Sequence, residues 1–172
     1  NKYFEIMKAK KKFDLHYESL DLLPHPSSYV PAIVKFNDGM VKIIAHDTNM
    51  KIPIFNSLHN SQKKIKTDEL NLKKLNFLNF KKVDINKFPS VKIIKQLKNN
   101  ESSLETIIVL ANDKLVDLFL LKKINFTDIV KFLQKLINMK KFTNLKKKKL
   151  KNINSIIWLN KEISSTINKM IA

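Results

Sequence analysis

The chain has 172 residues, 44% of them hydrophobic, so it is long and apolar enough to bury a core rather than remain disordered. Cysteine is absent, which excludes disulfides, thiolate metal sites and thiol nucleophiles. No uninterrupted apolar run approaches the roughly 20 residues of a membrane span, and no apolar stretch near the first residue resembles a signal peptide. We therefore expect a soluble protein from a reducing compartment, with no membrane partner.

The net charge of +18, from 33 basic and 15 acidic residues, would by itself suggest a polyanionic partner such as RNA. The basic residues are lysines spread along the chain beside abundant Asn and Ile, a pattern typical of AT-rich coding. Arginine, which is best suited to bidentate recognition of phosphates and bases, is absent. We therefore interpret the charge as diffuse, expect no specific nucleic-acid partner, and interpret the run Lys146–Lys149 as a solvated loop.

The single glycine, Gly39, excludes a glycine-rich phosphate loop of the dinucleotide or P-loop type. This segment therefore does not itself cradle a nicotinamide cofactor. Because Asn1 is not a start methionine, we expect the chain to begin within a longer protein. The four histidines show no spacing typical of a metal site.

The N-terminal third predicts a helix, a β-hairpin and a second, short helix. His25-Pro26 forces an extended backbone, and the residues that follow are rich in strand formers. Asn37-Asp38-Gly39 predicts the hairpin turn, with Gly39 at positive φ. The predicted elements are a helix over 1–15, strands over 29–36 and 40–45, and a short helix over 53–58.

A polar segment over 60–84, with scattered Leu and Phe anchors, is interpreted as an extended connector that lies across a surface. After it, apolar residues at three- and four-residue spacing predict four helices, over 89–98, 104–122, 127–139 and 153–171, that form a small bundle. Thr127 is the predicted N-cap of the third, with Asp128 in its first turn. The expected core comprises Ile107, Leu115, Phe119, Ile129, Phe132, Ile156, Ile163 and Ile167.

Several short motifs, none decisive alone, occur in one order along nearly the whole chain. They are Asn1-Lys2-x-x-Glu5, His25-Pro26-Ser27-Ser28, Phe36-Asn37-Asp38-Gly39, Met50-Lys51-Ile52-Pro53-Ile54, Phe88-Pro89, Ala111-Asn112-Asp113 and Phe126-Thr127-Asp128-Ile129. In this order and at these spacings they resemble the C-terminal part of 1-deoxy-D-xylulose 5-phosphate reductoisomerase. The resemblance implies conversion of that sugar phosphate to 2-C-methyl-D-erythritol 4-phosphate, an isoprenoid precursor, with NADPH and Mg²⁺ or Mn²⁺ as cofactors.

The resemblance also implies the domain organisation. Residues 1–60 would end the catalytic domain, 61–88 would form the connector, and 89–172 would form the C-terminal helical domain. The expected fold class is α+β, with a helix and β-hairpin from the catalytic domain, an extended connector and a C-terminal four-helix bundle. The NADPH-binding domain and two of the three metal carboxylates would lie outside this chain, so the segment alone is expected to be inactive. The whole enzyme would be a homodimer in the bacterial cytoplasm or the plastid stroma.

The first predicted helix carries the candidate binding residues. Asn1, Lys2 and Glu5 are close enough in sequence to crowd one end of that helix. From spacing alone, a surface Lys–Glu pair is the simpler interpretation. The resemblance implies that Asn1 and Lys2 bind the substrate phosphate and that Glu5 binds the divalent metal. An ammonium suits a phosphate and a carboxylate suits a hard cation. No catalytic residue is assigned.

The resemblance makes His25, Ser28 and Met50 possible neighbours of the active site. His25 is equally interpretable as a structural hydrogen-bonding residue, and Met50 as a core residue. The chain also departs from the family pattern, since Pro31 stands where the family has a second His and Val109 where it has Asn. The other departures replace Asp by Asn49, Arg by Lys51 and Glu by Asp113. These changes leave open an alternative function, a non-catalytic basic scaffold or RNA-associated protein that retains the domain.

The interpretation of the charge as diffuse predicts how this protein binds nucleic acids. Binding of this protein to duplex DNA or structured RNA should be weak and should be lost at moderate salt, because a polycation without a built site binds only by counterion release. Fluorescence anisotropy titrations over a range of salt concentrations would measure this. Nanomolar, sequence-selective binding at physiological salt would instead favour the RNA-associated alternative.

Overall fold

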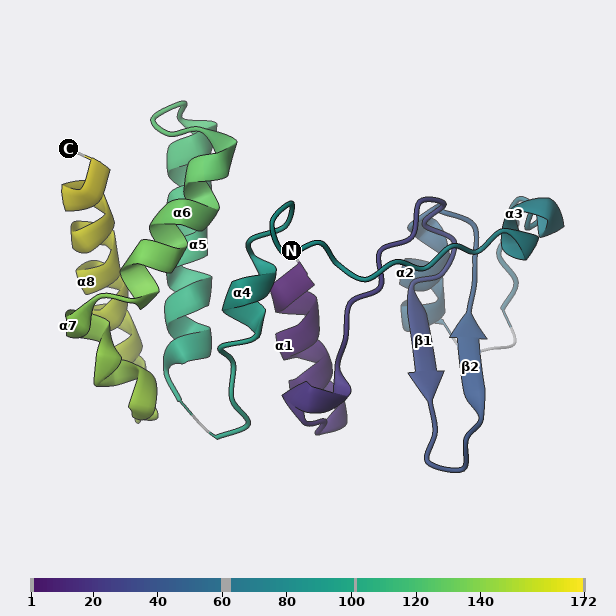
Figure 1. Ribbon diagram of the computed structural model, residues 1–172, viewed down its shortest axis with the longest axis horizontal. Helices are drawn as coiled ribbons and strands as arrows, with labels where there is room; N and C mark the ends of the chain where they lie inside the picture. The colour runs from purple at the N-terminus through teal and green to yellow at the C-terminus, as the bar shows by residue number, and fades with distance from the viewer. Residues whose placement is uncertain (1, 60–62, 101, 172) are drawn as a thin grey trace. The chain divides into compact units, whose positions relative to one another are not determined.

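The computed structural model describes residues 2–59, 63–100 and 102–171, which form two compact units (Figure 1). The helical unit comprises Asn1–Asp21 together with Asp84–Ala172, and the hairpin unit comprises Leu22–Val83. The fold is mostly helical with one small antiparallel sheet, which confirms the α+β class. The first helix shares a compact unit with the C-terminal helices, although it was expected to group with the hairpin. The predicted domain bounds 1–60, 61–88 and 89–172 stay a prediction.

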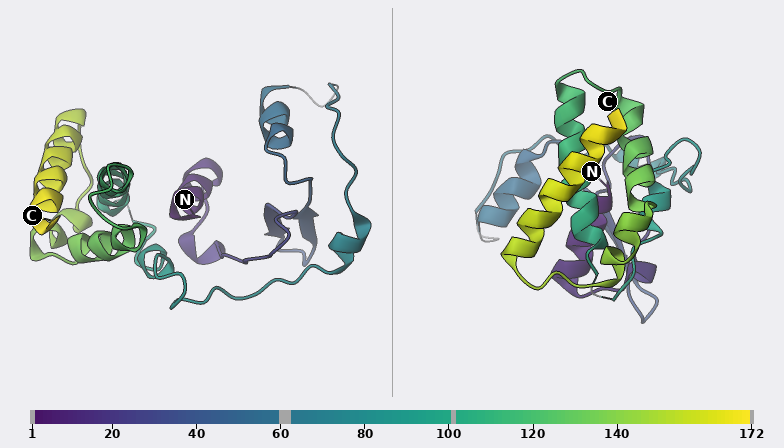
Figure 2. Two further views of the ribbon diagram at one scale, coloured as in Figure 1. Left: turned by 90° about the horizontal axis from the view of Figure 1, so that it is seen from above. Right: turned by 90° about the vertical axis from the view of Figure 1, so that its left-hand side faces the viewer.

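Three long helices pack together in the helical unit: α5 (Leu104–Leu120), α6 (Phe126–Ile137) and α8 (Ile153–Ile171) (Figures 1 and 2). The fourth helix of the predicted bundle, expected over 89–98, is a single turn, α4 (Val91–Ile94), and it contacts α1 (Lys2–Phe13). The four-helix bundle is therefore not confirmed. The remaining elements of this unit are η1 (Tyr17–Ser19), α7 (Lys140–Thr143) and η2 (Leu145–Lys147).

Asn99 supplies a physical reason for the early end of α4. Its side-chain oxygen accepts a hydrogen bond from the Tyr17 backbone N–H at 2.8 Å, and its side-chain nitrogen donates to Glu18 Oε2 at 2.6 Å. Asparagine competes with helical backbone hydrogen bonds, and here its carboxamide instead holds the segment after α1. Asn99 thus makes a tertiary contact rather than extending the helix.

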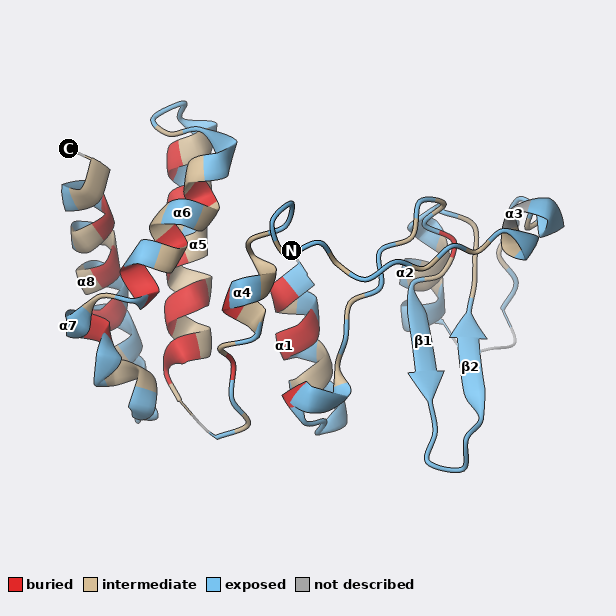
Figure 3. Cartoon of the chain, in the orientation of Figure 1, coloured by how far each residue is buried: buried red, intermediate tan, exposed pale blue. Residues whose placement is uncertain are grey.

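The core of the helical unit lies between α5, α6 and α8, as the buried residues in Figure 3 show. Of the predicted core, Ile107, Leu115, Ile129, Ile163 and Ile167 are buried, and Phe119 and Phe132 are half-buried. The prediction that Ile156 belongs to the core is wrong, because this residue lies in the first turn of α8 and remains 39% exposed. The prediction also missed Phe142 of α7, the largest side chain among those that are fully buried.

The first turn of α6 is held by a capping box of Asn125 and Asp128. The prediction that Thr127 is the N-cap is therefore wrong, because Asn125 occupies that position. The Asp128 carboxylate accepts a hydrogen bond from the Asn125 N–H at 3.0 Å, and this bond is the main reason that the pKa of Asp128 is lowered. Thr127 lies inside the helix with its side chain exposed. A reciprocal pair satisfies the helix end better than a lone hydroxyl, and it moves the start of the helix back to Phe126.

The loop before α8 is attached to the start of α5 through the buried Ser103. The Ser103 hydroxyl donates to Leu145 O at 2.6 Å, and the Ser103 N–H donates to Lys148 O at 2.8 Å. Lys146 is half-buried, and burial lowers its pKa. The other members of the run Lys146–Lys149 are exposed, in agreement with the predicted solvated loop.

The hairpin unit contains the predicted hairpin. Strands β1 (Ala32–Lys35) and β2 (Val41–Ile44) pair antiparallel, with Ala32 opposite Ile44 and Lys35 opposite Val41. The Phe36 N–H donates to Met40 O at 2.8 Å, and the Gly39 N–H donates to Phe36 O at 3.1 Å. Gly39 has φ +88°, so the turn places its only glycine where positive φ is required. Both strands are exposed along their full length, as Figure 3 shows.

Two short helices, α2 (Lys51–Leu58) and α3 (Leu72–Asn76), complete the hairpin unit. The helix predicted over 53–58 is thus confirmed, whereas α3 was not expected within the connector. The described residues around α3 have no other regular structure, and the Lys81 N–H donates to Pro24 O at 3.2 Å. The connector is therefore attached to the segment that precedes the hairpin; residues 60–62 lie outside the described residues.

Gly39→Val should lower the free energy of unfolding by on the order of 1 kcal/mol or more, because a β-branched residue resists positive φ. A Cβ at this position would meet no atom within 4 Å, so backbone strain alone is expected to act. Urea denaturation of both proteins would measure the change. Gly39→Asn is the matched control, because Asn tolerates this conformation and should lose less stability. Equal stability of Gly39→Val and the parent would contradict the positive-φ turn.

Candidate functional site

Lys2 and Glu5 lie together in the first turn of α1, as their spacing predicted. Lys2 Nζ lies 2.7 Å from Glu5 Oε2, and the two side chains are 67% and 58% exposed. An ammonium and a carboxylate thus meet at an open helix end, where each is free to exchange its partner for a ligand of opposite charge. Asn1, the third member of the predicted group, lies outside the described residues.

The buried side of α1 is attached to α5 beside this pair. The Tyr3 hydroxyl donates a hydrogen bond to Asn112 Oδ1, and Tyr3 itself is buried. Burial raises the pKa of Tyr3 to about 12, with a further contribution from the charge of Asp113. The Ala111-Asn112-Asp113 motif therefore contacts the helix that carries Lys2 and Glu5.

A second attachment lies at the other end of α1. Glu105, at the start of α5, accepts a hydrogen bond from the Tyr17 hydroxyl and pairs with Lys11 at 2.8 Å. Burial makes the largest contribution to raising the pKa of Tyr17, and the hydrogen bond to Glu105 makes the next largest. Sequence reasoning missed these residues, because no local pattern connects positions 88 apart in the chain.

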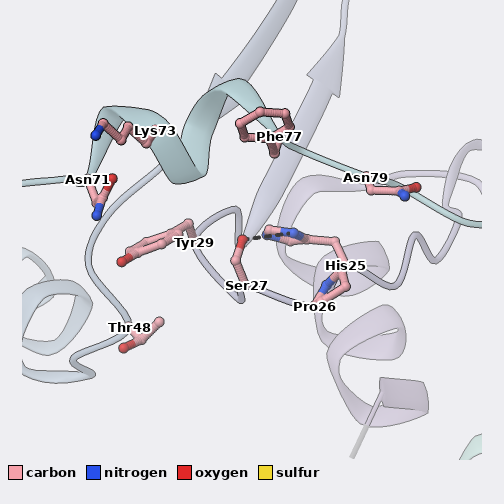
Figure 4. Close-up of a pocket in the computed structure, with 9 residues that line it drawn as sticks. All are labelled: His25, Pro26, Ser27, Tyr29, Thr48, Asn71, Lys73, Phe77 and Asn79. Atoms are coloured by element: carbon pink, nitrogen blue, oxygen red, sulfur yellow. Dashed lines mark hydrogen bonds between the residues drawn. The ribbon is translucent and has the colours of Figure 1, made fainter.

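In the hairpin unit, His25 borders a hollow of about 660 Å³ (Figure 4). The Val30 N–H donates to His25 Nε2 at 3.2 Å, and the other ring nitrogen, Nδ1, lies 3.2 Å from Ser27 Oγ. Because a backbone amide can only donate, Nε2 accepts, and the neutral ring carries its proton on Nδ1. The ring also packs against Phe80, with centroids 5.2 Å apart. His25 therefore has the structural hydrogen-bonding role that the sequence left open.

The hollow is lined by residues of the 25–29 segment, by Thr48, and by residues of α3 and its flanks. Figure 4 shows Lys73 of α3, and Phe77 just after that helix, across from His25 and Ser27. Sequence reasoning missed the polar members contributed by the connector, since their polarity resembles that of any solvated segment. The lining residues are His25, Pro26, Ser27, Tyr29, Thr48, Asn71, Lys73, Phe77 and Asn79.

Ser28 and Met50, the other predicted neighbours, do not line this hollow. Ser28 is exposed at φ +54°, and Met50 is 64% exposed at the start of α2. The interpretation of Met50 as a core residue is therefore wrong. Just before the N-cap Met50, Asn49 Oδ1 accepts a hydrogen bond from the Lys51 N–H at 3.0 Å.

Within the described residues, no group of three or more His, Asp or Glu side chains could hold a metal ion. Glu5 therefore offers one carboxylate, and a complete site would need ligands from outside the described part of the chain. In the same described ranges, no helix combines the length and apolarity needed to cross a membrane.

Most of the chain matches the model of one protein family. Residues 46–165 match the model of the DXP reductoisomerase C-terminal domain. The chain belongs to the 1-deoxy-D-xylulose 5-phosphate reductoisomerase family. This confirms the family inferred from the ordered motifs.

Two curated relatives named 1-deoxy-D-xylulose 5-phosphate reductoisomerase show how much of the protein is present. The one from Pelagibacter ubique is 52% identical over 171 residues, which are 99% of this chain and 44% of the relative. The one from a Sulfurihydrogenibium species is 34% identical over 169 residues, 98% of this chain and 43% of the relative. The chain thus spans less than half the length of these relatives.

Solved reductoisomerase structures have the same fold as this chain. A reductoisomerase described with fosmidomycin and magnesium matches with a TM-score of 0.83 at 25% identity, over 99% of this chain and 44% of that one. The Zymomonas mobilis reductoisomerase in complex with NADPH matches with a TM-score of 0.81 at 24% identity, with the same coverage. The fold is therefore that of the C-terminal part of these reductoisomerases.

The hydrogen bonds of His25 predict its tautomer. At mildly alkaline pH the neutral ring should carry its proton on Nδ1, which is the minor form of a free imidazole, because Val30 requires an acceptor at Nε2. Imidazole ¹⁵N chemical shifts of the protein labelled at histidine would report it. The exposed His16 serves as the reference in the same spectrum. A proton on Nε2 of His25 would show that Val30 does not bond to the ring.

Proposed function

We propose that this chain is the C-terminal segment of an NADPH-dependent and divalent-metal-dependent reductoisomerase that converts 1-deoxy-D-xylulose 5-phosphate to 2-C-methyl-D-erythritol 4-phosphate. The observation that carries the proposal is the 52% identity over 171 residues to the Pelagibacter ubique relative of that name. Similar solved structures described with NADPH, fosmidomycin and magnesium support the choice of cofactors and of a phosphate-bearing substrate. The whole enzyme would be a homodimer of the bacterial cytoplasm or plastid stroma, with NADPH bound outside this chain.

In this proposal, Lys2 holds the phosphate of the substrate, together with Asn1. The Lys2 ammonium is exposed and pairs with the Glu5 carboxylate. A surface pair of this kind contributes at most about 1 kcal/mol, so a phosphate dianion can displace the carboxylate at little cost. Phosphate anchoring at a distance from the reacting carbons would supply binding energy that orients the rest of the substrate.

Glu5 would be one ligand of Mg²⁺ or Mn²⁺. Its carboxylate is exposed and presents hard oxygen donors, which fit such cations, and the other ligands would come from outside this chain. When bound, the cation would polarise the vicinal oxygens of the substrate for the skeletal rearrangement that precedes reduction by NADPH. Glu5 then has two tasks, to hold the cation and to leave Lys2 available for the phosphate. His25, Ser28 and Met50 belong to the proposal as neighbours of the active site.

Two substitutions in the full-length enzyme test these roles. Glu5→Gln keeps the size of the side chain but removes its charge, so it should weaken metal binding and lower kcat by on the order of 100-fold. Lys2→Ala should act mainly through the phosphate, raising KM for the substrate and lowering kcat as well if anchoring supports the transition state. Metal-dependent oxidation of NADPH measures both.

Lys131→Ala is the matched control, because it breaks an exposed Lys–Asp pair of the same three-residue spacing on α6. It should leave both kinetic constants near those of the parent enzyme. If Glu5→Gln kept the parent rate and metal requirement, the metal role of Glu5 would be wrong. If the full-length parent showed no metal-dependent NADPH oxidation, the proposed function itself would be wrong.

A further inference from the structure

Helix α1 and the turn that follows it are connected to α5 at two separate points by polar side chains. Near its start, the Tyr3 hydroxyl bonds to Asn112. Near its end and just beyond, Lys11 and the Tyr17 hydroxyl both reach the Glu105 carboxylate. Tyr3 is the residue directly after Lys2 and lies two positions before Glu5.

We propose that Asn112 and Glu105 of α5 are positioning residues that set the orientation of α1, and through it the positions of the Lys2 ammonium and the Glu5 carboxylate. The proposal rests on the proposed function of Lys2 and Glu5 as phosphate and metal ligands. Neither Asn112 nor Glu105 is proposed to touch the substrate or the metal.

The two connections are in register. Positions 3 and 11 of α1 lie about 12 Å apart along the helix axis, and positions 105 and 112 of α5 lie about 10.5 Å apart, at a rise of about 1.5 Å per residue. The partners pair in reverse order, residue 3 with 112 and residue 11 with 105, as in two helices that run in opposite directions. Attachment at two points along one axis limits both sliding of α1 and its rotation, which a single bond would permit.

Burial makes these contacts specific. Tyr3 and Tyr17 are buried, and the Glu105 side chain is only 18% exposed. A buried hydroxyl or carboxylate that loses its partner is destabilising, so alternative orientations of α1 that break these bonds are disfavoured. Since Tyr3, Ile6 and Met7 form the buried side of α1 while Lys2 and Glu5 are exposed, rotation of the helix would move both candidate ligands together.

The partner helix is itself held firmly. Ile107, Ile108, Ala111 and Leu115 of α5 are completely buried, and α5 packs against both α6 and α8. A helix held by this core provides a more precise support than a loop. The side chains that bond to α1 therefore start from a rigid element, as positioning residues require.

The decisive experiment uses the full-length enzyme and the variants Tyr3→Phe, Asn112→Leu and the double variant. Each removes the hydrogen bond between Tyr3 and Asn112, and Tyr3→Phe keeps the buried ring. Mn²⁺ binding is measured by electron paramagnetic resonance, in parallel with kcat, KM and the melting temperature. We expect Mn²⁺ affinity and kcat to fall about threefold to tenfold in each single variant, the range of one net hydrogen bond. The double variant should be no worse than the worse single variant, because both changes remove one shared interaction.

The second connection is tested by Lys11→Met, which removes an exposed side chain and does not threaten folding. It should also weaken Mn²⁺ binding, whereas Lys131→Met, which breaks the exposed pair on α6, should not.

A variant that only loses stability would change the melting temperature while Mn²⁺ affinity at low temperature stays that of the parent, and this outcome would overturn the proposal. Parent-like Mn²⁺ affinity and kcat in Tyr3→Phe would also overturn it. A parent enzyme without metal-dependent NADPH oxidation would instead overturn the proposed function, so the two failures are distinct.

Discussion

Burial of α5 is the interaction on which the helical unit depends. Its side chains Ile107, Ile108 and Leu115 have no exposed surface, and α5 packs against both other long helices. Complete burial of a large aliphatic side chain contributes about 1.5–3 kcal/mol, so these few residues outweigh any of the surface ion pairs in the unit. At its start, Ser103 holds the loop before α8, and this bond connects the last helix to the same element.

The same helix combines an apolar core with polar attachments. Glu105 and Asn112 lie on α5 among completely buried residues, yet each has a hydrogen-bonding partner on α1 or just after it. Among the described residues, no buried side-chain nitrogen or oxygen lacks a hydrogen bond. Because an unsatisfied buried polar group is destabilising, this arrangement specifies one orientation of α1 rather than merely permitting it. The helical unit thus provides a firm support for the helix end that carries Lys2 and Glu5.

The hairpin unit is built differently. Within the described part of Leu22–Val83, Tyr29 is the one buried residue, and apolar side chains such as Ile43 and Val41 are about half exposed. A two-stranded sheet is marginally stable in water without a hydrophobic surface to pack on. The local turn, with Gly39 at positive φ, therefore specifies the hairpin but does not supply much stability. The hollow beside His25 is similarly open to solvent. There, hydrogen bonds such as that from the Val30 N–H to His25 hold the side chains in place.

The sequence by itself determined the features that depend on neighbours a few residues apart. The Asn37-Asp38-Gly39 turn, the long helices and the contact between Lys2 and Glu5 follow from local backbone geometry, and the ordered motifs were sufficient to identify the family. Five of the eight predicted core residues are buried for the same reason, since helical spacing places them on one face.

Only the tertiary structure decided which surfaces are covered and which distant side chains meet. Ile156 has the right spacing for the core but lies in the first turn of α8, where it stays exposed, while Phe142 stands in a lysine-rich segment and is completely buried. The bonds from Tyr3 to Asn112 and from Tyr17 to Glu105 join positions 109 and 88 residues apart. Such contacts depend on how whole helices pack, and packing is set by the combined burial of many side chains rather than by any local pattern.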